Sequence, residues 1–142
     1  MQAAVSSPID WKGKFFFSAA KRSFYQMLRR ISPEHTVFAK VRLCDVLSAS
    51  RRINSGRASD QRTQSKQLDF LICDATLAPV LAVELDDSSA VQVDGKTRDQ
   101  FVNAALAAAA IPIVRIPMRW SYAPHDVQRW VVPHLHSLGP TC

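Results

Sequence analysis

The sequence lacks a long apolar run. No stretch reaches the roughly 18 to 20 apolar residues that a helix needs to cross a bilayer. The run Phe15–Phe16–Phe17 near the N-terminus is too short for the apolar region of a signal peptide. We therefore expect a chain that is neither secreted nor embedded in a membrane.

Cysteine is also scarce. The three cysteines, Cys44, Cys73 and Cys142, have no CxxC spacing and an odd count, so they favour neither a zinc site nor a disulfide framework. This usage favours a reducing cytoplasm. The sequence contains no internal repeat and no low-complexity linker, and its 142 residues are 47% hydrophobic and 21% charged. A single globular domain over residues 18–142 is expected, after an N-terminal extension over residues 1–17.

Acidic residues are outnumbered, and the net charge of +6 favours a polyanionic partner such as nucleic acid. Most of the excess lies in residues 48–67, where five cations and one acid, Asp60, give +4. The cations are Arg51, Arg52, Arg57, Arg62 and Lys66. The arginines of this basic segment could contact backbone phosphates without reading sequence. A solvated loop without large apolar residues explains the same composition.

Periodicity indicates where the first elements lie. Phe24, Leu28 and Ile31 recur at helical spacing, and Ser18 could cap a helix over residues 18–31. The alternating stretch "TVFAKVRL" predicts a half-exposed strand. Two apolar runs, "LDFLICD" and "PVLAVELD", are separated only by "ATLA" and predict an antiparallel hairpin of buried strands.

The rest of the chain predicts a helix, a strand and a second helix. Residues 97–110 form an Ala-rich helix whose buried face is expected to contain Phe101, Ala105, Leu106 and Ala109. "IPIVRIP" follows as a short buried strand, and "HDVQRWVVPHLHSL" as a terminal helix interrupted near Pro133. The expected order is α, β, β, β, α, β with a helical tail.

Three carboxylates mark the hairpin. If its loop is symmetric, Asp74 faces Pro79 and Asp69 lies opposite Glu84. Opposed residues have Cβ atoms roughly 4.5 to 5.5 Å apart, a separation at which two carboxylates repel unless a cation lies between them. Asp86 falls on the same face because strand side chains alternate. Asp69, Glu84 and Asp86 therefore form a candidate site for Mg²⁺ or Mn²⁺. Acidic residues that mark where a strand emerges into solvent would give the same spacing.

The blocks "SKQLDFLICD", "PVLAVELDDSS", "RDQFVNAALAAAAIPIVRIP" and "VFAKVRLCDVL" resemble the bacterial DUF2726 family, a branch of the restriction-endonuclease-like PD-(D/E)XK superfamily. The resemblance runs from about residue 18 to 117. It implies an α/β fold with an αβββαβ core, a mixed central sheet flanked by helices and a C-terminal helical tail. By this resemblance Asp69 and Glu84 match the two acidic motif residues, and Asp86 stands where many superfamily members carry a lysine.

Three positions depart from the family pattern. Lys21 stands where the first helix usually carries Glu, Ala90 where His is usual, and Ala110 where Gly usually precedes "IP". The first two would weaken a hydrolytic centre. The third costs about 1 kcal/mol relative to Gly if the helix ends in a left-handed conformation.

Two functions follow from these residues. The first is a metal-dependent nuclease that hydrolyses phosphodiester bonds, with Asp69, Glu84 and Asp86 at the metal. Lys66 or Lys96 would stabilise charge near the attacking water, and Lys66 is preferred because the resemblance includes it. An exposed lysine that contacts phosphate is the alternative role for either residue. The second is a degraded nuclease fold that binds nucleic acid or a protein partner without catalysis, which the departures Lys21 and Ala90 favour.

Overall fold

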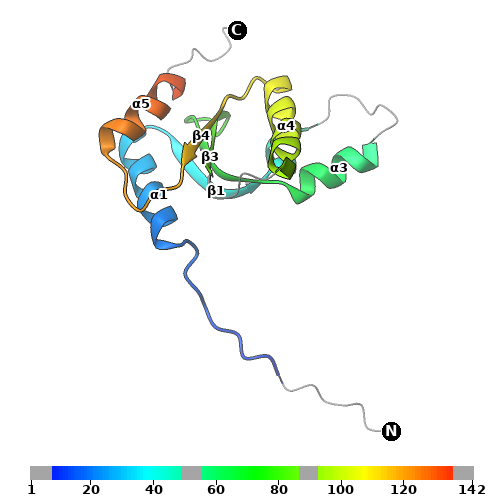
Figure 1. The fold of residues 1–142 in the computed structure, drawn as a ribbon, viewed down its shortest axis with the longest axis horizontal. Coiled ribbons are helices and arrows are strands. Elements are labelled where there is room, and N and C mark those ends of the chain that lie inside the picture. The colour runs from blue at the N-terminus through cyan, green and yellow to red at the C-terminus, as the bar shows by residue number, and fades with distance from the viewer. Residues whose placement is uncertain (1–7, 49–55, 87–92, 136–142) are drawn as a thin grey trace.

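The computed structural model describes residues 8–48, 56–86 and 93–135. Within these ranges four strands form one mixed sheet in the order β1-β2-β3-β4. β1 (Thr36–Arg42), β2 (Gln67–Cys73) and β3 (Pro79–Asp86) are antiparallel neighbours, and β4 (Ile113–Pro117) runs parallel to β3. Helices flank the sheet (Figure 1), so the predicted α/β class is confirmed. None of the described helices is long and apolar enough to cross a membrane.

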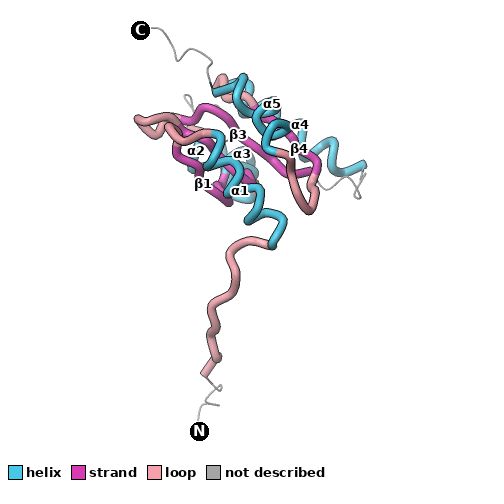
Figure 2. Tube along the Cα trace, turned by 90° about the vertical axis from the view of Figure 1, so that its left-hand side faces the viewer, coloured by secondary structure: helices cyan, strands magenta, loops and turns pink. Residues whose placement is uncertain are grey.

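Helices cover both faces of the sheet. α1 (Ala19–Ile31) and α5 (Pro124–Leu135) pack on one face through a core that includes Phe24, Phe70 and Val131. α4 (Val93–Ala108) and the short α2 (Leu43–Val46) pack on the other through a second core. α3 (Gly56–Ser65) lies beside α2, away from the α1–α5 layer (Figures 1 and 2).

α1 forms where the sequence predicted it. Phe24 and Leu28 are fully buried one helical turn apart, and the Ser18 Oγ accepts a hydrogen bond from the Lys21 backbone N–H at 3.3 Å. This N-cap satisfies one of the donors that every helix start leaves without an internal partner. It also fixes the first turn, and with it the position from which the Lys21 side chain extends.

The chain before α1 leads away from the domain (Figures 1 and 2). Its last residues are held to the sheet, because Lys40 Nζ donates to the Phe16 carbonyl oxygen at 2.7 Å. The Phe17 ring packs against Phe70, with ring centroids 5.8 Å apart. Trp11 and Phe15 are exposed.

The regular alternation of β1 and β2 breaks at one level of the sheet. Ala39 and Phe70 are paired and belong to the α1–α5 side, whereas the paired Val41 and Leu68 belong to the α4 core. Lys40, between the two pairs, has φ 53°, a left-handed conformation that is uncommon for a residue with a Cβ. Asp69 lies at this level of β2, and its side chain is half-buried.

The hairpin has the predicted register over most of its length. Phe70 pairs with Val83, and the next two pairs toward the loop follow the same register. The predicted symmetric loop is wrong, because the register shifts after Ile72 and Pro79 pairs with Cys73 rather than with Asp74.

Asp74 closes this turn instead. Its Oδ1 accepts hydrogen bonds from the Thr76 hydroxyl and from the Thr76 and Ala78 backbone N–H groups. These bonds lower the pKa of Asp74, the largest contribution coming from the Thr76 hydroxyl. Leu77, between them, has φ 65°.

α4 ends in a left-handed residue, as the sequence suggested. Ala110 has φ 58°. Its N–H donates to the Ala107 carbonyl oxygen at 3.0 Å, and the Ile111 N–H donates to the Leu106 carbonyl oxygen at 2.9 Å. This is the Schellman pattern of helix ends. The predicted burial of Ala109 is wrong, because the helix has already turned outward there and Ala109 is exposed; Val102 is buried instead.

Two other expectations need correction. The basic segment contains a helix, α3, which its lack of apolar periodicity did not predict. The terminal helix α5 continues through Pro133 to Leu135, because Pro133 lies in its last turn and its missing N–H costs a single hydrogen bond.

Candidate functional site

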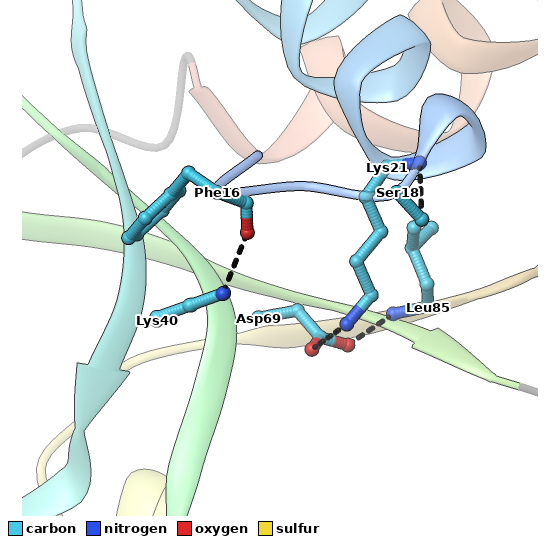
Figure 3. Close-up of polar contacts among 6 residues, drawn as sticks. All are labelled: Phe16, Ser18, Lys21, Lys40, Asp69 and Leu85. Atoms are coloured by element: carbon cyan, nitrogen blue, oxygen red, sulfur yellow. Dashed lines mark hydrogen bonds and ion pairs between the residues drawn. The ribbon is translucent and has the colours of Figure 1, made fainter. Parts of the chain in front are cut away.

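Asp69 is bound by two groups of its own chain. Lys21 Nζ, from the first turn of α1, lies 3.4 Å from Oδ1 of Asp69, and the Leu85 backbone N–H donates to Oδ2 at 2.9 Å (Figure 3). The Lys21 and Asp69 side chains are 30% and 28% exposed, so the ion pair is only partly screened by water. Asp69 therefore links α1 to both central strands.

Glu84 has a different cationic partner. It pairs in parallel register with Arg115 on β4, and Arg115 Nε lies 3.5 Å from Oε2 of Glu84. Their side chains are 25% and 19% exposed. At such depth, removing one charge destabilises the fold because the other charge stays buried without compensation.

The third predicted ligand, Asp86, is exposed at the end of β3, and its carbonyl oxygen accepts a hydrogen bond from the Met118 N–H at 2.9 Å. Across the described ranges, no three Asp, Glu, His or Cys side chains are grouped so that they could hold a metal ion. With Lys21 and Arg115 bound to the carboxylates, the donor set does not fit a divalent cation as it stands. The predicted Mg²⁺ or Mn²⁺ site stays a prediction.

Among the predicted basic residues, the structure describes the side chains of Lys66 and Arg62. Lys66 is half-buried, and its carbonyl oxygen accepts a hydrogen bond from the Leu43 N–H at 2.8 Å, just before β2 begins. The Arg62 guanidinium lies 5.5 Å from the centre of the Phe101 ring on α4. Arg57 is on α3, but its side chain is outside the described part, as are Arg51, Arg52 and Ala90 altogether.

Comparison with protein families gives one match. The profile of the family described as "Protein of unknown function (DUF2726)" matches residues 14–133, most of the chain. The chain belongs to this family. No curated protein and no solved structure matched. The DUF2726 match spans α1 through most of α5, so the site residues Lys21, Asp69, Glu84 and Arg115 all belong to the family domain.

One site residue of this DUF2726 domain was missed from the sequence. Arg115 is the only charged side chain in "IPIVRIP", and a cation inside a buried strand requires a partner. The sequence carried that signal. It did not show that β4 pairs with β3, because the two strands are separated along the chain by α4. Lys21 was noticed only as a departure from the family pattern, whereas its spatial relation to Asp69 depends on how α1 lies on the sheet.

Proposed function

We propose that this DUF2726 domain has the restriction-endonuclease-like PD-(D/E)XK fold and binds nucleic acid without cleaving it. Its elements α1, β1, β2, β3, α4 and β4 follow the αβββαβ order of that superfamily, with α2 and α3 as additions. The observation that carries the loss of catalysis is the ion pair between Lys21 and Asp69.

The positive charge beside Asp69 and Glu84 comes from basic side chains of the same chain. A metal-dependent nuclease places a divalent ion between its acidic residues, and a water on that ion has a strongly lowered pKa. Here Lys21 and Arg115 supply the positive charge to Asp69 and Glu84. An ammonium and a guanidinium neutralise carboxylates but cannot bind and ionise a water in this way. The two ion pairs therefore support a structural role for Asp69 and Glu84.

Binding of nucleic acid is supported by the charge distribution. The chain carries a net charge of +6, and its first helix contains no acid and four cations, of which Lys21 is already paired with Asp69 and the other three are exposed. These cations are Lys21, Arg22, Arg29 and Arg30. A dense cationic surface attracts phosphate backbones whether or not the protein cleaves them.

The decisive experiment reverses the charge at position 21. The wild type is expected to show no cleavage of DNA or RNA, duplex or single-stranded, with Mg²⁺ or Mn²⁺, and no rise in melting temperature on adding either ion. Lys21→Glu should melt at a lower temperature without metal, because it places two carboxylates together, and Mn²⁺ should restore part of the loss. Arg22→Glu makes the same charge change on an exposed neighbour and should show no such restoration.

A metal-dependent nuclease is the competing function, and the hairpin register favours it. The three regular pairs extend toward Asp69 on β2 and Glu84 on β3, as the metal-site hypothesis requires. In this case Lys21 would leave Asp69 when the ion binds. Mg²⁺-dependent cleavage by the wild type that is lost in both Asp69→Asn and Glu84→Gln would establish this function and refute the non-catalytic one.

A further inference from the structure

An open pocket of about 820 Å³ lies between the second half of α1 and the start of β1. The polar residues that line it are Tyr25, Gln26, Arg29, Arg30, Ser32, His35 and Thr36. It is separate from the acidic site, because Lys21 and Arg29 are eight residues apart on α1, roughly 12 Å along the helix axis.

The pocket is cationic. Arg29 and Arg30 are exposed, and His35 is half-buried beside them. None of the described residues that line the pocket is acidic. In the part of the chain that the structure describes, neither arginine is in an ion pair with an acid. Hydrogen bonds from Thr76 and Ala78 hold the Asp74 carboxylate in its own turn and lower its pKa, to which His35 adds only a small contribution.

The pocket also has a rigid wall. The Tyr25 ring stacks on Phe70 of the core, with centroids 6.2 Å apart and an angle of 19° between the rings. The Arg29 guanidinium lies 5.9 Å from the centre of the Tyr25 ring, and this cation–π contact stabilises the guanidinium against the ring. Gln26 and Thr36 add hydrogen-bond donors at the rim.

We propose that this pocket binds a backbone phosphate of a nucleic acid through Arg29 and Arg30. A guanidinium presents paired N–H donors that match a phosphate, and its charge is independent of pH in the physiological range. The helix C-terminus beneath them carries about half a negative charge, which two full positive charges outweigh. The inference rests on the proposed nucleic-acid binding and names its contact surface, which is α1 rather than the segment around α3.

The experiment compares two double variants that remove the same charge. Arg29→Gln with Arg30→Gln empties the pocket of its arginines, and Gln keeps the helix propensity. Arg119→Gln with Arg129→Gln is the matched control, since both lie outside the pocket, Arg119 over the Trp130 ring and Arg129 beside Asp126. Binding of labelled duplex and single-stranded oligonucleotides is followed by fluorescence anisotropy over a salt series, with melting temperatures to verify folding.

The pocket variant should bind at least tenfold more weakly. The slope of log Kobs against log salt should become shallower by up to roughly 0.9 per lost contact on duplex DNA and about 0.7 on a single strand. The control variant should keep most of the wild-type slope, and Arg29→Lys with Arg30→Lys should recover the slope more fully than the affinity. If the double Arg→Gln substitution destabilises the fold, each single Arg→Gln variant should give half of the change in slope.

The outcomes separate the two proposals. Equal weakening in both double variants, or none in the pocket variant, overturns the pocket assignment and leaves nucleic-acid binding intact. A wild type that binds no oligonucleotide overturns both. A wild type whose Arg29 and Arg30 NMR signals shift with inorganic phosphate but not with any oligonucleotide overturns the assignment to nucleic acid and identifies a free-phosphate site.

Discussion

Replacing Ala110 by Gly should stabilise the domain. Ala110 closes α4 at φ 58°, where a Cβ costs roughly 1 to 2 kcal/mol for an L-residue. Glycine removes that strain but makes the unfolded chain more flexible, which offsets about 0.4 to 1 kcal/mol of the gain in stability. The net gain is therefore about 1 kcal/mol, or a rise of roughly 3 to 4 °C in melting temperature for a domain of this size.

The measurement is equilibrium unfolding in urea, with Ala104→Gly as the control. Ala104 is exposed in the same helix, away from its end, so the same chemical change should there cost about 0.5 to 1 kcal/mol. Both variants have the same effect on the flexibility of the unfolded chain, and only the native backbone conformation differs. A loss of stability in Ala110→Gly equal to that of Ala104→Gly would refute the strain argument.

Three further predictions concern packing, pH and thiol accessibility. Ala105→Leu should cost roughly 1 to 3 kcal/mol by overpacking the α4 core, whereas Ala109→Leu should stay within about 0.5 kcal/mol because Ala109 is exposed; thermal unfolding of both tests this. Because its hydrogen bonds lower the pKa of Asp74, Asp74→Ala should be less stable than the wild type at pH 7. The difference should shrink as the pH falls below about 3.9, and unfolding curves measured at several pH values check it. Burial raises the pKa of the Cys73 thiol, so iodoacetamide should modify Cys44 in the folded protein and Cys73 only after unfolding, as mass spectrometry of the labelled peptides would record.

Local patterns were enough to predict most elements of the fold. α1 follows from the spacing of Phe24 and Leu28 and the Ser18 cap, because these determinants lie within one helix. The left-handed end at Ala110 was expected only from the family resemblance, in which Gly usually precedes "IP". α3 was not, because its stability does not come from an apolar stripe, and the loop of the hairpin was misplaced by one residue because the Asp74 side chain, not strand pairing, shapes the turn.

The candidate site was predicted less completely than the fold. Asp69 and Glu84 were selected as candidates because hairpin register can be worked out from a short stretch of sequence. Their partners could not be found in this way: Lys21 precedes Asp69 by 48 residues, and Arg115 reaches Glu84 through a parallel pairing across α4. Contacts between distant segments depend on how helices pack on the sheet, which periodicity does not determine.

The ion pair between Lys21 and Asp69 has a consequence for any cation in solution. Because both groups belong to the same folded chain, Lys21 is present at Asp69 at an effective concentration that does not change when the protein is diluted. A solvent cation has to compete with it at every protein concentration. Occupancy of Asp69 therefore depends on how α1 is seated on the sheet and on the concentration of the competing cation, but not on the concentration of the protein.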